Sequence, residues 1–345
     1  SCLPENISST IAEKLVNHWV AQLKKSPELH DKIEFEVAIT TFSFDIDEKI
    51  EELVSNVLTA KEKAEFKQAH LNQTMRLIKG ENMGSLNNAF DKIESLKKKQ
   101  KTPSSLPIML NDCIELGTIP FSILARHGFI AKTILLSLKQ QGIITKDEVS
   151  QMQASFHTVA GEFVEDLKSM QEGVLCTTDF MEKYGHLRPG TYDIMLKRYD
   201  QMTDFSSEKP LDQSLKKLKP FVFSKVQKNQ INNLLNDCGF GDFNSNELLN
   251  YINQAIVGRE YSKFVFTRSV SDIIELIAQF AEENGLTRNE ISHVPLNEIL
   301  NILKNSDEIN ITQQLREISE VQLQKHDVSV AIRLPQLLAD QAGVY

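Results

Sequence analysis

The chain has 345 residues, of which 41% are hydrophobic and 25% charged, and it contains only 14 glycines and 10 prolines. These fractions exclude a collagen-like, low-complexity or fibrous protein. The net charge of −9 leaves no excess of Lys and Arg to neutralise phosphates, which excludes a typical nucleic-acid partner. The composition predicts a soluble, mostly helical protein of one or two domains.

The cysteines and the most apolar segment bear on compartment and cofactors. The four cysteines form no Cys-x-x-Cys pair and have no histidine at zinc-ligand spacing, so we expect neither a metal site nor a disulfide framework. A reducing, cytoplasmic location is expected. Residues 119–138 carry Arg126, His127 and Lys132, which are costly at the centre of a bilayer. We therefore expect a buried helix there and no membrane partner.

Helix starts are marked by Thr-x-x-Glu patterns, in which the hydroxyl and the carboxylate each bind a backbone N–H group. These patterns occur at residues 10–13, 59–62, 145–148 and 287–290. Apolar residues at spacings of three and four predict further helices over residues 45–57, 86–98, 120–140, 225–235, 247–283, 295–303 and 312–325.

One segment departs from helical spacing. Residues 33–37 alternate apolar and polar side chains, and β-favouring residues follow to Phe44. This pattern predicts a short strand. A buried helical turn would fit the same residues. The predicted fold is mainly α, a multi-helix domain with at most a short β element near residues 33–44. We divide it into an N-terminal helical subdomain, residues 1–105, and a main helical domain, residues 106–345.

The main domain contains a polar, glycine-flanked loop, YGHLRPGTYD, at residues 184–193. Its two glycines permit tight turns and its proline stiffens the bend between them. Such a loop could bind an anionic or hydroxylated substrate, with Arg188 as a bidentate donor and His186 as a general base or polar anchor. Tyr192 and Asp193 complete this candidate binding set. The alternative is a structural loop that locks helices together, with His186 and Asp193 bonded to the backbone.

A second candidate lies within the predicted helix 247–283. Arg259 and Lys263 fall one turn apart on one helical face, so both side chains can address the oxygens of one phosphoryl group. The alternative is that Glu260, Lys263 and Arg268 form only surface ion pairs, worth under ~1 kcal/mol.

Five blocks of sequence, spread over nearly the whole chain, resemble the middle region of phosphoenolpyruvate-synthase-like proteins. Their family, the phosphoenolpyruvate-utilising enzymes, includes the pyruvate phosphate dikinases and rifampin phosphotransferases. The blocks are SPELHDKIEFEVA (26–38), GTIPFSILARHGFIA (117–131), FMEKYGHLRPGTYDI (180–194), GREYSKFVFTRSVSD (258–272) and AIRLPQLL (331–338). The family motif in the third block often reads His-Arg-Gly-Pro, whereas Leu187 and Arg188 here place the arginine one position later.

The resemblance implies a function. Family members join an ATP-grasp domain, a helical middle region and a swiveling domain that carries a phosphorylated histidine. This chain is therefore expected to be the middle, acceptor-binding region of an ATP-dependent phosphotransferase, without the ATP-grasp and swiveling domains and with a small-molecule acceptor. The resemblance implies no cofactor in this segment, and ATP and Mg²⁺ for the full-length protein.

The resemblance also bears on the site residues. In the rifampin enzymes, a helical Arg-x-x-x-Lys pair lies beside the acceptor hydroxyl, and Arg259 and Lys263 match that pair. We expect the 345-residue segment alone to be inactive, because it contains neither a Gly-rich phosphate-binding motif nor the family's catalytic-histidine signature. The alternative is a non-catalytic helical scaffold or a segment that forms a homodimer.

Overall fold

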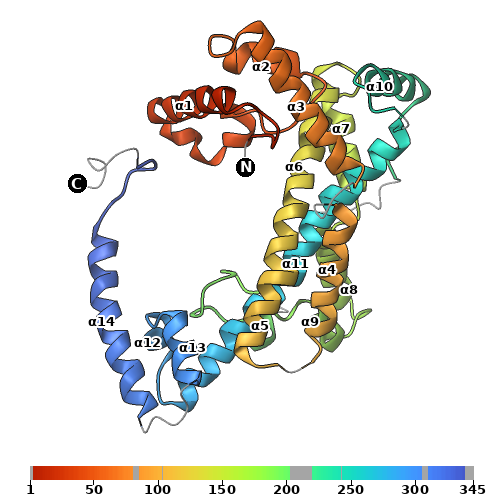
Figure 1. The fold of residues 1–345 in the computed structure, drawn as a ribbon. Coiled ribbons are helices and arrows are strands. Elements are labelled where there is room, and N and C mark those ends of the chain that lie inside the picture. The colour runs from red at the N-terminus through yellow and green to blue at the C-terminus, as the bar shows by residue number, and fades with distance from the viewer. Residues whose placement is uncertain are drawn as a thin grey trace.

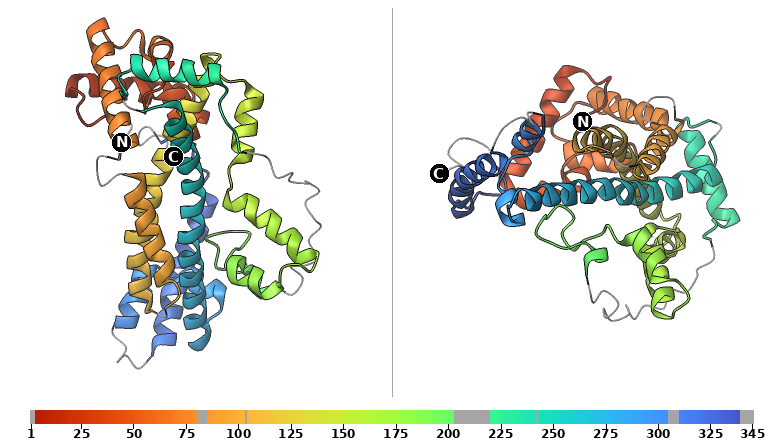
Figure 2. Two further views of the ribbon diagram at one scale, coloured as in Figure 1. Left: turned by 90° about the vertical axis from the view of Figure 1, so that its right-hand side faces the viewer. Right: turned by 90° about the horizontal axis from the view of Figure 1, so that it is seen from below.

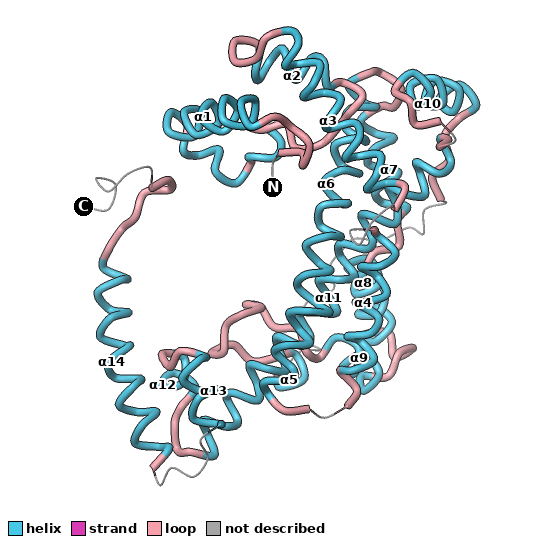
Figure 3. Tube along the Cα trace, viewed as in Figure 1, coloured by secondary structure: helices cyan, strands magenta, loops and turns pink. Residues whose placement is uncertain are grey.

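The computed structural model describes residues 3–80, 85–102, 104–202, 220–241, 243–304 and 310–338. It is 73% helical, and no β-strand occurs among these residues (Figure 3). The mainly α fold predicted from the sequence is therefore confirmed.

The described α-helices follow one another in the order α1 (Ser9–Lys25), α2 (Ile46–Val54), α3 (Ala60–Ile78), α4 (Leu86–Lys99), α5 (Leu106–Asp112), α6 (Ile119–Gln140), α7 (Lys146–Ser155), α8 (Val159–Gln171), α9 (Thr177–Tyr184), α10 (Lys225–Asp237), α11 (Ser245–Glu283), α12 (Arg288–Ser292), α13 (Leu296–Lys304) and α14 (Ile311–Ala331). Two 3₁₀ helices, η1 (Pro27–Asp31) and η4 (Tyr199–Gln201), and two π-helical turns, η2 (Ile33–Val37) and η3 (Cys113–Thr118), lie between them.

Two long helices, α6 and α11, pack side by side and form the central column of the fold (Figure 1). Helix α4 packs against both of them. Helices α1 to α3 lie at one end of the column and α12 to α14 at the other, while α8 and α9 stand to one side of α11 (Figure 2). Each side of α11 therefore meets a different part of the chain.

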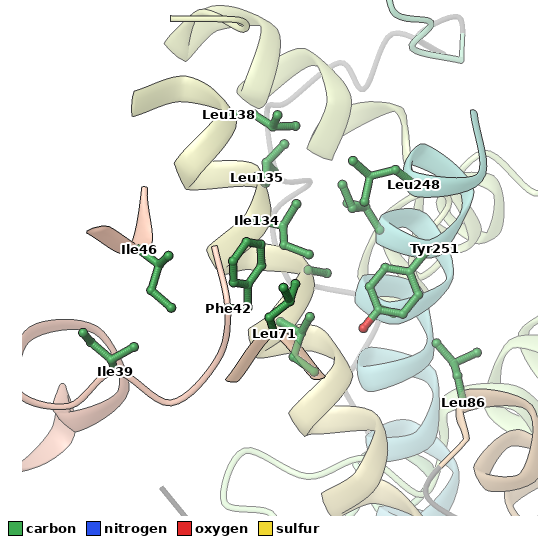
Figure 4. Packing of buried hydrophobic residues seen from close by; sticks show 14 of the residues in the cluster. Ile39, Phe42, Ile46, Leu71, Leu86, Ile134, Leu135, Leu138, Leu248 and Tyr251 are labelled. Atoms are coloured by element: carbon green, nitrogen blue, oxygen red, sulfur yellow. The ribbon is translucent and has the colours of Figure 1, made fainter. Parts of the chain in front are cut away.

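The main hydrophobic core follows this column. Ile134, Leu135 and Leu138 of α6 lie close to Phe42 and to Leu248 of α11 (Figure 4). A second cluster joins the end of α11 to α12, α13 and α14, and a third joins α8 and α9. Helices α1 to α3 therefore share the main core, whereas α12 to α14 and α8 to α9 each pack in a separate cluster.

The predicted capping boxes can be compared with the observed helix starts. Both hydrogen bonds of the box are present at Thr59, Thr145 and Thr287. The prediction at Thr10 is wrong, because α1 begins at Ser9, two residues earlier than predicted, and the Ser8 hydroxyl accepts the N–H of Ile11 instead. The cap therefore lies two residues before the predicted position.

The strand predicted within residues 33–44 is not found among the described residues. Ile33–Val37 form the π-helical turn η2, which is close to the helical alternative that the same residues allowed. Within this turn Phe35 and Glu36 are both exposed and Ile33 and Glu34 are both half-buried, so burial does not follow the alternation of apolar and polar side chains. The alternation therefore does not mark one solvent face and one core face.

Helices α5, η3 and α6 form one continuous segment, Leu106–Gln140. The segment is long enough to cross a membrane, and the mean hydropathy of an 18-residue window within it is 1.4, which is apolar enough to do so. Core helices of soluble proteins pass the same test. Leu124, Ile130 and Leu135 of α6 are buried in the main core. The lack of a membrane partner stays a prediction.

Gly117 in η3 marks a close approach of this segment to α4 and α11. A Cβ atom at this position would lie 2.9 Å from Cβ of Phe266 and 3.0 Å from Cδ2 of Leu96. Because the Phe266 Cβ is fixed to the α11 backbone, we expect Gly117→Ala to lower the free energy of unfolding by about 1–3 kcal/mol. Urea denaturation measures this loss.

The matched control is the same substitution at Gly161 in α8, where the nearest atom to an added Cβ is 3.8 Å away. Alanine is the better helix former, so Gly161→Ala should leave stability unchanged or raise it by up to about 1 kcal/mol. Equal effects at both glycines would contradict the close packing at Gly117.

Candidate functional site

The glycine-flanked loop is held against α11 by Arg188. The side chain of Arg188 is 1% exposed. Its Nη1 donates to the carbonyl oxygens of Asp193 (3.1 Å) and Leu196 (3.2 Å). Its Nη2 donates to Glu275 Oε1 (2.9 Å) and Ser271 Oγ (3.0 Å). Both terminal nitrogens of the guanidinium are therefore engaged by the protein itself.

His186 is buried beside the same helix. The residue is 2% exposed, and its ring packs edge-on against Phe264 with 4.9 Å between centroids. Its carbonyl accepts a hydrogen bond from the Ser271 hydroxyl (2.7 Å), and its ring lies against the backbone of Phe264. Burial, and then the charges of Arg268 and Arg198, lower the pKa of His186 to about 3. The ring is therefore neutral at pH 7.

Tyr192 and Asp193 lie at the surface end of the loop. Tyr192 is 66% exposed. Asp193 accepts the backbone N–H of Met195 through Oδ1 (2.8 Å), an Asx-type contact that shapes the turn. Both residues line an apolar groove of about 650 Å³ between the loop, η3, α11 and α12–α13. Of the four predicted substrate-binding residues, two are thus buried and two are exposed.

Glu275 of α11 joins the loop to α12. It accepts hydrogen bonds from Arg188, from Arg288 Nη2 (2.7 Å) and from Gln201 Nε2 (2.8 Å). Burial would raise the pKa of Glu275, but the hydrogen bonds from Arg288 and Gln201, with the charge of Arg288, outweigh it and lower the pKa to about 2. Glu275 is not among the residues predicted from the sequence, because its partners are distant in the chain and no local pattern identifies them.

Arg259 and Lys263 are both exposed on α11. The Arg259 guanidinium lies 5.5 Å from the ring centroid of Phe129 on α6. Its stem passes over Gly128, where an added Cβ would meet Arg259 Cδ at 3.0 Å. Within the described part of the chain, neither cation forms an ion pair with a carboxylate. Two cations without a counter-charge therefore stand one turn apart.

The two predicted groups of site residues occupy different sides of α11. At 3.6 residues per turn, Phe264, Ser271 and Glu275, which contact the loop, lie roughly 120–160° around the helix axis from Arg259 and roughly 80–120° from Lys263. The structure thus brings His186 together with Arg188 and leaves Arg259 with Lys263 on another side. No group of three or more His, Cys, Asp or Glu side chains in the described ranges could hold a metal ion.

The buried imidazole of His186 predicts a pH dependence. Its pKa of about 3 lies below the ordinary 6.5, so below pH 6.5 the unfolded chain binds a proton at this residue that the folded chain does not. Stability is therefore complete above pH 6.5 and falls by about 1.4 kcal/mol per pH unit as the pH drops toward 3. We expect His186→Leu to make this fall less steep, as measured by urea denaturation across the range.

His157 offers the control for this prediction, because its side chain is 69% exposed. His157→Gln should leave the pH slope of stability close to that of the parent chain. His70 is also buried, with a pKa lowered to about 3 by burial and by Arg126, so part of the slope will persist in His186→Leu. An unchanged slope in His186→Leu would contradict a neutral, buried His186.

Comparison of the chain with protein-family models, with curated proteins and with solved structures finds no match.

Proposed function

We propose that this chain is the acceptor-binding helical region of an ATP-dependent phosphotransferase that resembles phosphoenolpyruvate synthase. The phosphoryl group would come from partner domains of the same protein, an ATP-grasp domain and a swiveling histidine domain. ATP and Mg²⁺ would bind to the full-length protein outside this region. The acceptor would be a small molecule with a hydroxyl or enolate oxygen.

The observation that carries the proposal is the Arg259–Lys263 pair. Other arginines beside α11 are paired with a carboxylate, as Arg188 and Arg288 are with Glu275. Arg259 and Lys263 have no such partner in the described part of the chain. Two cations one turn apart can bind the oxygens of a transferring phosphoryl group, the guanidinium by a fork of hydrogen bonds and the ammonium as a point charge.

In this proposal the glycine-flanked loop positions α11. Ser271 and Glu275 both bond to the loop, on the same helix as Arg259 and Lys263. Because the His186 ring is buried, it could contact an acceptor only if the loop moved. The phosphoryl-binding role therefore falls on Arg259 and Lys263, and His186 and Arg188 fix the helix that carries them.

A specific observation also favours the second candidate, a non-catalytic scaffold. The loop satisfies Arg188 and Asp193 with its own backbone, which is the arrangement expected of a structural lock. In this candidate Arg259 would only pack over Phe129 and Lys263 would be a solvated surface charge. Removal of Lys263 would then have no effect on any transfer reaction.

Mass spectrometry of the full-length gene product tests the proposal. The protein is incubated with ATP, Mg²⁺ and candidate acceptors such as pyruvate, a hydroxylated antibiotic and a sugar. We expect one acceptor to gain a phosphoryl group, and the yield to fall strongly when Arg259 and Lys263 are both replaced by alanine. Phosphorylation of an acceptor that is unaffected by the double substitution would contradict the assigned site.

A further inference from the structure

A separate pocket of about 510 Å³ lies where α8 and α9 meet α4 and α11. Its volume is within the range of small-molecule sites, which often occur between structural units. Three of the residues that α11 contributes to the pocket, Val257, Phe264 and Arg268, lie roughly 140–180° around the helix axis from Arg259. The pocket thus lies on the side of α11 that faces away from Arg259 and Lys263. The pocket is therefore distinct from the proposed phosphoryl site.

Helix α11 supplies an apolar floor to this pocket. Val257, Phe264 and Val265 line it. Phe264 is backed by Tyr184, at 5.8 Å between ring centroids, and by His186, at 4.9 Å. Since both of these residues are buried in the glycine-flanked loop region, the floor is held rigidly. It can pack against the apolar body of a ligand.

Cations line the wall formed by α4 and α11. Arg268 donates through Nη2 to the carbonyl oxygens of Glu182 (2.7 Å) and Lys183 (2.8 Å), and Lys97 donates to the Tyr261 hydroxyl (2.8 Å). Arg268, Lys97 and Lys101 have no ion pair with a carboxylate in the described ranges.

Lys101 and Arg268 lie at the same end of the pocket. Gln100, the residue before Lys101, donates through Nε2 to the Val265 carbonyl and to Ser269 Oγ, both at 2.8 Å. These two contacts span the turn of α11 that carries Arg268. An anionic group at this end can therefore meet both charges.

Carboxylates line the opposite wall, formed by α8 and α9. Glu162 is neutralised by Lys183 (3.1 Å) and contacts His157 (2.8 Å). Asp179 and Glu182 form no ion pair within the described residues. The pocket therefore presents Lys97 and Lys101 on one wall, Asp179 and Glu182 on the other and an apolar floor between them. Arg268 reaches from α11 to the α9 carbonyls and so lies close to both walls.

We propose that this pocket binds a zwitterionic small molecule with an apolar body, of which apolar α-amino acids are the simplest members. Its carboxylate lies between Lys101 and Arg268, its ammonium group faces Asp179 and Glu182, and its side chain rests on Phe264 and the neighbouring valines. Each charged group of the ligand then meets protein charges that form no ion pair within the described residues, although Arg268 also donates to the α9 carbonyls. The inference is independent of the proposed phosphotransfer.

Ligand-observed saturation-transfer NMR on the whole chain tests this site with L-phenylalanine, L-leucine and L-methionine as probes. We expect at least one to bind at millimolar concentration. Its N-acetyl derivative lacks the ammonium charge and its amide lacks the carboxylate, so each should bind about tenfold more weakly, as expected for the loss of one charge-assisted hydrogen bond. Failure of all three probes, or equal binding of the capped derivatives, would overturn the proposal.

Variants locate the binding. Lys101→Ala and Glu182→Gln should each weaken the amino acid about tenfold. Lys98→Ala is the matched control, because Lys98 is exposed on the same helix end and does not line the pocket, and it should change affinity by less than about twofold. Lys263→Ala, which lies outside the pocket, should also leave the affinity for the amino acid unchanged. Loss of binding in Lys263→Ala, or unchanged binding in both pocket variants, would overturn the assignment.

Discussion

Replacing Lys263 with alanine in the full-length protein is expected to slow phosphotransfer about 10²–10³-fold, the loss typical when one donor to a developing negative charge is removed, ~2.7–4 kcal/mol. The melting temperature should stay unchanged, because the Lys263 side chain is exposed and has no ion pair in the described part of the chain. A rate assay with the identified acceptor and a thermal melt measure the two quantities on one preparation.

Lys263 is the sharper probe of the pair. Arg259 also packs over Phe129 and Gly128, so its removal would lower stability as well as rate and mix the two effects. Lys98→Ala on α4 serves as the control for the loss of an exposed lysine and should leave the rate unchanged. If Lys263→Ala lowers the rate by less than about threefold, Lys263 is a surface residue, as in the scaffold candidate.

The long helices could be predicted from the sequence because their signals are local. Helix α11 keeps one apolar period for 39 residues and starts with a hydrogen-bonded cap at Asn244. Helices α8 and α9 were not predicted. They are short, and their core is completed by Tyr199 and Phe264, which belong to other segments. No window of sequence contains that core.

The difference between local signals and contacts between distant segments also explains what could be predicted about the site. Arg259 and Lys263 are neighbours because of helical spacing alone, so their proximity follows from the sequence. Arg188 instead finds Ser271 and Glu275, which are 83 and 87 positions away. Only the packing of the loop on α11 brings these groups together. The placement of the two groups on different sides of α11 depends on the same packing.

Removing the charge of Glu275 is expected to cause the largest loss of stability of any single substitution considered for this chain. Glu275→Gln leaves the guanidinium of Arg188, whose side chain is 1% exposed, without a counter-charge. Breaking a buried ion pair on one side typically costs about 3–5 kcal/mol, because the remaining charge stays desolvated. Urea denaturation should therefore show a midpoint far below that of the parent chain.

Glu282→Gln is the matched control for this substitution. Glu282 pairs with the same Arg288, at 3.8 Å, but its side chain is 60% exposed, so its loss should cost at most about 1 kcal/mol. Equal losses in the two variants would show that the network around Arg188 is not stabilised by its buried charge pair.

The pKa of Glu275 gives this substitution a second signature. At about 2, it lies below the ordinary value of 4.5, so the unfolded chain binds a proton at this residue more readily. Its contribution to stability is complete above pH 4.5 and is lost as the pH falls through 2. Glu275→Gln has no such contribution to lose, so the stability difference between variant and parent should shrink as the pH falls from 4.5 toward 2. A difference that stays constant across this range would mean that the carboxylate charge of Glu275 does not hold the loop on α11.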